Sequence, residues 1–418
     1  MTRPSRAPLV ITALSAVMLA LGACTPAPAQ GESTTSAASP PSSADPQLAA
    51  RVRTIVTDTM AKDHLNAVIV RVTVGGQPVI TEAFGESMPG VPATADMHFR
   101  NGAVSISYMS TALLQLVDEK KVSLDDKLAT WLPDMPHAGE VTLGQLAQMT
   151  SGYADYVQDP GLIGSFYDNP FRTFTPEELA FIGASKPLFY TPGTNWDYAH
   201  TNYVLLGLAL EKITGQRLDA LLEQKVLGPL GLKETHDPGT PAIPEPALHA
   251  YTSERRPHLG IPAATPFLED STYWNPSWTL ARGAIETTTI TDMATTADAI
   301  GSGRLLSPES HALQVSTALR GKTHAVDGCP TCFAQGEGYT YGLGVVISGN
   351  WLLQNPMFAG FSAVEASLPS KKIAIAVAAT YKAEAFDAKG ETPNRAQDLF
   401  RLIGAAAAPD DAPPVPKS

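Results

Sequence analysis

The sequence predicts an α+β fold, in which one antiparallel sheet is built from both ends of the chain and is flanked by helices and a mostly helical region. Strand-like segments lie near residue 70 and again beyond residue 340, whereas helical patterns broken by Pro and Gly fill the middle. Strands at both ends of a helical stretch are typical of such a sheet. The 418 residues, 44% of them apolar, suffice for a substantial core.

The first elements of the domain are a helix, a hairpin and a second helix. Residues 46–62 carry apolar side chains at helical spacing and predict an amphipathic helix. Residues 67–74 and 78–84, joined by Gly75-Gly76-Gln77, predict a β-hairpin. Residues 103–120 are mostly apolar and predict a long helix that ends in a charged turn.

Strands return near the C-terminal end. The candidate strands cover residues 341–348, 351–354, 361–368 and 373–381. Residues 392–404 predict a closing helix. We therefore expect one domain over residues 46–404, followed by a disordered tail over residues 405–418 that is rich in Ala and Pro.

The first 23 residues have the pattern of a signal peptide. Arg3 and Arg6 precede an apolar stretch that is too short to span a membrane as a helix. Leu21-Gly22-Ala23-Cys24 resembles the lipobox of bacterial lipoproteins, which implies a lipid on Cys24. The alternative is an ordinary secreted protein cleaved near Ala23. Residues 24–45 are rich in Ser, Thr, Ala and Pro and predict a disordered tether, so we expect a lipid-anchored protein on the extracytoplasmic side of the cell membrane.

Charge and cysteine content narrow the choice of partners. The formal net charge of −12 argues against nucleic acid as a partner. Cys329 and Cys332 lie in Gly-Cys-Pro-Thr-Cys, and an exported location permits a disulfide between them. A metal site would need two more ligands, and only His324 is near in sequence; a thioredoxin-like redox pair would need a preceding strand and a following helix. We therefore expect a disulfide, with no metal and no cofactor.

A series of short motifs recurs in one order along the chain. They are Phe99-Arg100, Gly102, residues 113–118, residues 123–126, Thr150-Ser151-Gly152, Asp155-Tyr156, Tyr190, Pro192-Gly193, Tyr198, Thr201-Asn202-Tyr203, residues 227–232, Gly283-Ala284-Ile285, Asp292-Met293, residues 341–344 and Gly360-Phe361-Ser362. This order resembles the penicillin-binding-protein and class C β-lactamase superfamily, especially its D-alanyl-D-alanine carboxypeptidase-like serine hydrolases. The resemblance covers about residues 46–402 and implies a β-lactamase/transpeptidase-like fold.

The residues that carry the chemistry of that superfamily are altered here. The resemblance implies a nucleophilic serine at position 103 and a proton-accepting lysine at position 106, but the chain has Ala103 and Ile106. Tyr198 is retained, whereas the asparagine that follows it in the family pattern is His200. The strand motif of the Lys-Thr-Gly or His-x-Gly kind falls at Gln354-Asn355-Pro356. All three catalytic motifs that the resemblance implies are therefore altered in this chain, and none is intact.

Four other serines are candidates for a relocated nucleophile. Ser105 is two positions beyond Ala103 and is predicted to point about 200° away, to the far face of the helix. Ser107 has Ser110 rather than a lysine one turn later. Ser151 and Ser362 have no base nearby in sequence. Turn formation or hydrogen-bond capping is the competing explanation for each.

Other residues near the motifs have two interpretations. Because an imidazole group can gain or lose a proton near neutral pH, a histidine such as His200 could transfer protons, or it could only hydrogen-bond its neighbours. Tyr273, Trp274 and Trp278 could line a groove or pack in the core. Arg282 could pair with a ligand carboxylate or lie on the surface.

Two functions follow from these observations. The first is a binding or regulatory pseudoenzyme of the cell envelope, whose ligand is a peptidoglycan peptide or an envelope protein. The alternative is an active D,D-carboxypeptidase, esterase or amidase with a non-standard site. The replacement of a partly buried lysine by Ile106 also predicts that restoring Ser and Lys would not stabilise the protein.

Overall fold

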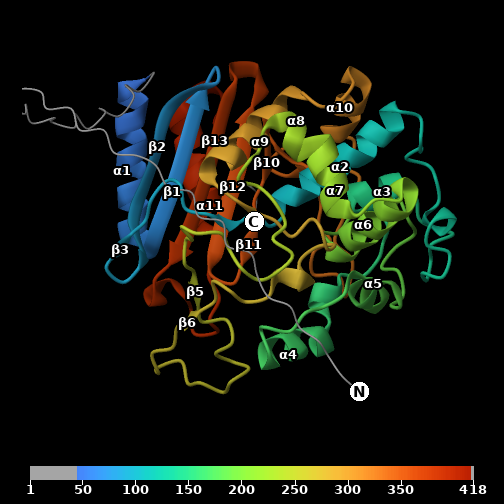
Figure 1. Ribbon diagram of the computed structural model, residues 1–418, viewed down its shortest axis with the longest axis horizontal. Coiled ribbons are helices and arrows are strands. Elements are labelled where there is room, and N and C mark those ends of the chain that lie inside the picture. The colour runs from blue at the N-terminus through green and yellow to red at the C-terminus, as the bar shows by residue number, and fades with distance from the viewer. Residues whose placement is uncertain (1–44, 416–418) are drawn as a thin grey trace, which may run out of the picture. The chain divides into compact units, whose positions relative to one another are not determined.

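A computed structural model describes residues 45–415 and confirms the predicted α+β class. Its centre is an antiparallel sheet of nine strands in the order β3-β2-β1-β13-β12-β10-β9-β8, with β11 paired to β12 (Figure 1). The bounds are β1 Leu65–Val74, β2 Gln77–Met88, β3 Val91–Pro92, β8 Thr340–Tyr341, β9 Val346–Ser348, β10 Trp351–Gln354, β11 Met357–Phe358, β12 Phe361–Leu368 and β13 Ile373–Tyr381. Because β1 pairs with β13, the two chain ends meet in the middle of the sheet.

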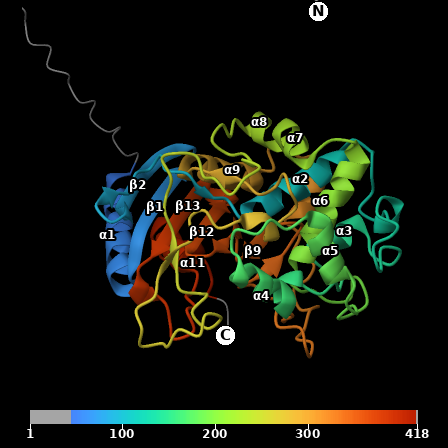
Figure 2. The same ribbon diagram turned by 60° about the horizontal axis from the view of Figure 1, so that its bottom comes forward.

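Helices cover both faces of this sheet and form a separate layer beside it. α1 and α11 pack together against one face, α9 covers the other, and α2, α3, α5 and α6 make up the helical region (Figures 1 and 2). The bounds are α1 Pro46–Asp63, α2 Val104–Asp118, α3 Leu143–Gln148, α4 Pro160–Asp168, α5 Pro176–Ala184, α6 His200–Thr214, α7 Leu218–Leu222, α8 Gly228–Leu230, α9 Ile290–Ser302, α10 Pro308–Gln314 and α11 Arg395–Ala407. Two further pairs of short strands are β4 Phe99–Arg100 with β7 Thr287–Thr288, and β5 Tyr251–Thr252 with β6 Glu269–Asp270.

The ends of α1 follow from local chemistry. The Asp45 carboxylate accepts a hydrogen bond from the Leu48 N–H over 2.9 Å, and Pro46 occupies the first turn, where its missing N–H costs nothing. His64 ends the helix in the left-handed conformation, with φ of 54°. The buried face of α1 includes Val52 and Val56, as the apolar spacing predicted.

One predicted strand is divided in two. Residues 341–348 were expected to be continuous, but β8 ends at Tyr341 and β9 begins at Val346. Between them Gly344 has φ of 72°, and a Cβ atom there would lie 2.5 Å from Oγ of Ser110. The chain therefore turns at this glycine in order to pass close to α2.

The predicted tail also differs from the structure. α11 continues to Ala407, and residues 409–411 form a short 3-10 helix. Nε1 of the buried Trp351 donates a hydrogen bond to the Asp411 carbonyl over 2.7 Å, and Lys371 pairs with the Asp411 carboxylate at 2.9 Å. Composition alone suggested disorder because it does not show these partners.

The signal peptide, Cys24 and nearly all of the predicted tether lie outside the described residues. Within residues 45–415, no helix combines the length and the apolar character needed to cross a membrane.

Candidate functional site

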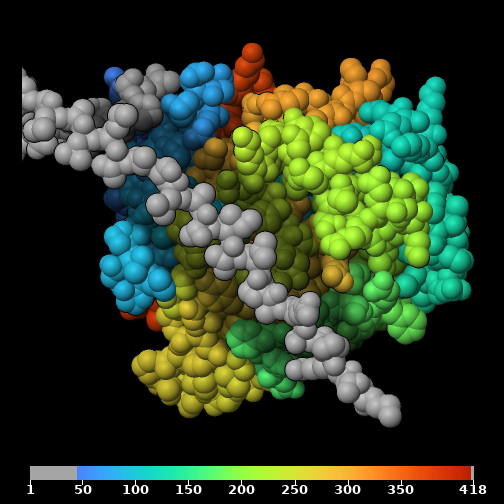
Figure 3. Space-filling view, viewed as in Figure 1, coloured from blue at the N-terminus to red at the C-terminus, as the bar shows by residue number. Residues whose placement is uncertain are grey.

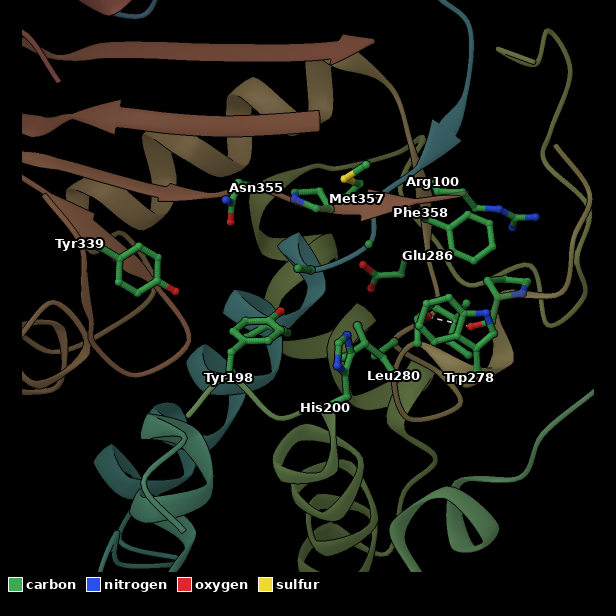
Figure 4. A pocket seen from close by; sticks show the side chains of 18 residues that line it. Arg100, Tyr198, His200, Trp278, Leu280, Glu286, Tyr339, Asn355, Met357 and Phe358 are labelled. Atoms are coloured by element: carbon green, nitrogen blue, oxygen red, sulfur yellow. Dashed lines mark hydrogen bonds between the residues drawn. The ribbon is translucent and has the colours of Figure 1, made fainter. Parts of the chain in front are cut away.

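A cavity of about 330 Å³ lies where the N-terminal end of α2 meets the loop between β10 and β11 (Figure 4). Its lining is mainly apolar and aromatic, with a few polar groups. The lining residues are Arg100, Gly102, Ala103, Ile106, Tyr198, His200, Pro276, Trp278, Thr279, Leu280, Ala284, Ile285, Glu286, Tyr339, Asn355, Pro356, Met357 and Phe358. Four of the five positions singled out from the sequence are among them.

Ala103 and Ile106 lie one helical turn apart on the same wall of the cavity. A turn at Gly102, with φ of 55°, brings this end of α2 against Pro356, and a Cβ at position 102 would lie 2.6 Å from Cβ of Pro356. Ile106 is only 1% exposed. The geometry thus presents both family positions to the cavity, but with a methyl group and an aliphatic chain.

Tyr198 and His200 also line the cavity, with their ring centroids 5.4 Å apart in an edge-to-face arrangement. The imidazole Nδ1 donates to the buried carboxylate of Asp155 over 3.1 Å, and the backbone N–H of His200 donates to the other carboxylate oxygen. Nε2 makes no hydrogen bond within residues 45–415. Burial raises the pKa of the Tyr198 hydroxyl well above its usual range, and the charge of Asp155 adds to this shift. Tyr198 therefore stays protonated, and His200 has a fixed orientation.

Gln354 differs from the other four positions, because it does not line the cavity. It is 1% exposed, and its Nε2 donates to the Gly344 carbonyl over 2.7 Å. Asn355 and Pro356 reach the cavity instead. The Asn355 amide donates to Gln397 of α11, so this side chain is already engaged.

Glu286 is the polar residue that sequence reasoning missed. It is 2% exposed, and its Oε2 accepts hydrogen bonds from Ser105 over 2.6 Å and from Asn101 over 3.0 Å. Oε1 has no partner among the described residues, and the carboxyl group points toward the middle of the lining side chains (Figure 4). Burial raises the pKa of Glu286 to about 7, although both hydrogen bonds oppose the shift. The available signal was one carboxylate between Ile285 and three threonines.

Arg100 is a second polar residue of the wall that sequence reasoning did not assign a role. Its Nη2 donates to the carbonyl oxygens of Pro241 and Thr272, and its guanidinium points away from Glu286 (Figure 4). Burial lowers the pKa of Arg100 to about 10, so it remains charged at neutral pH. Arg100 therefore holds the surrounding loops together rather than neutralising Glu286.

None of the four alternative serines lines the cavity. Ser105 is turned toward Glu286, and Ser107 donates to the Val104 carbonyl within α2. Ser151 donates to Asn202 over 2.5 Å, and Ser362 accepts from the Tyr381 hydroxyl over 2.6 Å. Each hydroxyl therefore has a structural partner, and none of the four is exposed to the cavity, although Ser105 bonds the Glu286 carboxylate that lines it.

The remaining candidates take different positions. Trp278 lines the cavity, Trp274 is buried against Phe166, and Tyr273 is exposed. Arg282 lies outside this cavity. Cys329 and Cys332 form a disulfide bond. Residues 45–415 contain no group of three or more His, Cys, Asp or Glu side chains placed to hold a metal ion.

A family model described as Beta-lactamase matches residues 52–400. The chain belongs to the Beta-lactamase family. This result confirms the resemblance that the ordered motifs indicated, and it places Ala103 and Ile106 within a family domain that covers most of the chain.

Curated relatives of this β-lactamase-family chain include a penicillin-binding protein and an esterase. Penicillin-binding protein 4 of Amycolatopsis lactamdurans is 34% identical over 41% of this chain and 42% of its own length. Esterase EstB of Burkholderia gladioli is 29% identical over 45% of this chain and 51% of its own length. The chain thus spans about half the length of these relatives.

Solved structures share the fold over a larger part of the chain. D-amino acid amidase from Ochrobactrum anthropi, complexed with L-phenylalanine amide, has a TM-score of 0.69 and 20% identity, covering 87% of this chain and 99% of that chain. D-stereospecific amidohydrolase from Streptomyces sp. has a TM-score of 0.66 and 24% identity, covering 80% and 96%. At these identities the likeness establishes the fold alone.

Proposed function

We propose that this β-lactamase-family chain is a cell-envelope protein that binds an amide-bearing ligand in its pocket without forming an acyl-enzyme. In this proposal it acts at the cell wall as a binding or regulatory pseudoenzyme, and its ligand is a peptidoglycan peptide or a related amide. Anchoring through a lipid on Cys24 would keep the domain near the outer face of the membrane.

One observation carries the proposal: among the described residues that line the pocket there is no serine, cysteine or lysine. Thr279 provides the single aliphatic hydroxyl of this described lining, and it donates to the Pro276 carbonyl over 2.7 Å. Acyl transfer by this family's route needs an exposed nucleophile with a base beside it. The pocket has lost both at positions 103 and 106 while remaining a formed cavity.

The composition of the wall supports binding. The apolar and aromatic lining provides contact area, and Glu286, Tyr198 and His200 provide a few oriented polar groups, which is the usual make-up of a small-molecule site. The relatives' names include a penicillin-binding protein, and a structural neighbour was solved with an amino-acid amide. We transfer this chemistry here as a proposed ligand class.

Intact-mass measurement with a labelled β-lactam and a fluorophosphonate tests the proposal. We expect no covalent adduct, and we expect D- or L-phenylalanine amide to raise the melting temperature while being recovered unchanged. A penicilloyl or phosphonyl adduct on any pocket side chain would contradict binding without acylation. Detergent partitioning of the wild type and of Cys24→Ala tests the lipid anchor, and only the wild type should enter the detergent phase.

A second candidate is a hydrolase that activates water through His200. Its specific support is the geometry of His200, whose Nδ1 is held by Asp155 while Nε2 has no partner within residues 45–415. A base oriented in this way can deprotonate water. If this candidate is right, aryl-ester hydrolysis should be lost in His200→Asn and kept in His324→Asn. Activity no higher than in buffer would reject it.

A further inference from the structure

A second cavity, of about 780 Å³, lies directly beside the family pocket. The two cavities share Trp278, Met357 and Phe358, and the rings of Trp278 and Phe358 stack with centroids 5.7 Å apart. On its outer side, the segment around residues 250–270, yellow in Figure 3, lies beside green α4. His258 of this segment pairs with Asp168 of α4 at 2.8 Å, which links the two elements.

The carboxylate of Glu254 lines this second cavity and makes no hydrogen bond or ion pair with any residue of the described chain. The neighbouring Arg255 pairs with Glu269 at 2.8 Å instead. Burial raises the pKa of Glu254 to about 7; the charge of Glu269 adds to this shift, and the charge of Arg255 opposes it. Glu254 is partly buried and has no direct ion-pair partner among the described residues, so a cation supplied by a ligand would be favoured here.

A rigid loop places further acidic charge in the same cavity. Gly390 has φ of 81°, and a Cβ there would lie 2.1 Å from the Ser253 carbonyl, so the loop packs directly against the segment that carries Glu254. One oxygen of Asp387 accepts hydrogen bonds from the backbone N–H groups of Lys389 and Glu391, over 2.8 and 2.9 Å. These bonds hold the backbone at Glu391, whose exposed side chain also lines the cavity.

Aromatic rings form much of the remaining wall. Phe166, Tyr167 and Phe386 line the cavity together with the shared Trp278 and Phe358. Burial raises the pKa of Tyr167, and the charges of Glu254 and Glu391 add to the shift. Ring faces attract ammonium groups, and aromatic walls combined with carboxylates are suited to an organic cation.

We propose that this second cavity binds the ammonium group of an amine with an apolar body, with Glu254 as the counter-ion and the aromatic rings around its carbon skeleton. Lys389 also lines the cavity but is exposed and forms no ion pair with Glu254 among the described residues. A metal ion fits less well, because these residues include no cluster with three ligating groups. The proposal does not depend on whether the family pocket is catalytically inert.

Calorimetric binding of 4-phenylbutylamine and 4-phenylbutan-1-ol tests it, since these probes differ mainly in charge. We expect the wild type to prefer the amine by about tenfold, and Glu254→Gln to reduce this preference to within about threefold. Glu384→Gln removes the same charge from an exposed site and should keep the preference. Thermal unfolding of each variant verifies that it is folded.

Three results would overturn the proposal: no amine binding at millimolar concentration, equal binding of amine and alcohol, or an unchanged preference in Glu254→Gln. Loss of the preference in Glu286→Gln alone would locate the amine in the family pocket and also overturn it. The adduct measurement that tests acylation has a separate readout, so the two proposals can fail independently.

Discussion

Ser105 donates a hydrogen bond of 2.6 Å to Glu286, although the two residues are 181 positions apart in the chain. Both are buried, and Asn101 contributes a second donor to the same carboxylate oxygen. This contact joins the first turn of α2 to the strand segment before α9. It also fixes the Glu286 carboxylate at the wall of the family pocket. Because its hydroxyl is engaged in this bond, Ser105 is not available to replace the missing nucleophile at position 103.

Ser105→Ala should destabilise the protein. The substitution removes one of the two donors to a buried carboxylate, which costs about 1 to 3 kcal/mol. Ser107→Ala is the matched control, because Ser107 is equally buried but bonds only the Val104 carbonyl of its own helix. Denaturant unfolding measures both variants. Equal losses would show that the Ser105–Glu286 contact has no special role.

The double substitution Ala103→Ser with Ile106→Lys should not stabilise the protein. It replaces an isoleucine that is 1% exposed by an ammonium group, and we expect a loss on the order of 2 kcal/mol in unfolding free energy. Labelling by a β-lactam should be at most partial, because His200 and Gln354-Asn355-Pro356 remain altered. A more stable variant, or one that labels to completion, would contradict these expectations.

Glu365 should make stability depend on pH. Burial raises its pKa to about 8, so it is neutral in the folded protein, whereas the unfolded chain ionises near the ordinary value of 4.5. The unfolded state therefore binds fewer protons between these values, and unfolding becomes easier as pH rises. Between pH 5 and pH 8, wild type should lose on the order of 3 kcal/mol relative to Glu365→Gln.

Denaturant titrations at several pH values, with exposed Glu384→Gln as the control, check the Glu365 prediction. Parallel pH profiles for wild type and Glu365→Gln would show that this carboxyl group is not responsible. Only the difference between the profiles is diagnostic, because Glu254 and Glu286 also have raised pKa values and shift stability in the same direction.

Gly102→Ala should cost about 2 to 3 kcal/mol, because it combines a left-handed backbone with a contact of 2.6 Å to Pro356. Gly90→Ala separates the two causes. Gly90 also has a positive φ, of 76°, but a Cβ atom there would have no neighbour within 4 Å, so only about 1 kcal/mol should be lost. Thermal unfolding that gives equal losses would exclude the proposed packing against Pro356.

The sheet could be predicted from local patterns, but its details could not. The alternating strands and the apolar run of β13 are visible in the sequence, and their pairing across the chain follows from the fold class. The break at Gly344 arises from its close approach to Ser110, and the order of residues 409–411 arises from Trp351 and Lys371. Both depend on residues far away in sequence.

Part of the candidate site could likewise be predicted from the sequence, and part of it could not. Spacing along one helix was enough to place Ala103 and Ile106 on one wall, because their separation is fixed by helical geometry. Glu286 and Glu254 could not be assigned in this way. They reach their cavities through loops whose partners, such as Ser105 and Gly390, lie far along the chain.

Pro356 limits what any later change at position 103 can achieve. It lies against Gly102 at the pocket wall, where the family motif would complete the site, and a proline has no amide hydrogen to offer to an incoming carbonyl group. A serine introduced at position 103 would thus have no lysine at position 106, and Pro356 beside it could not donate a backbone hydrogen bond to the substrate carbonyl. A single substitution to serine at position 103 would therefore not be enough to build an acylating site of the family's kind.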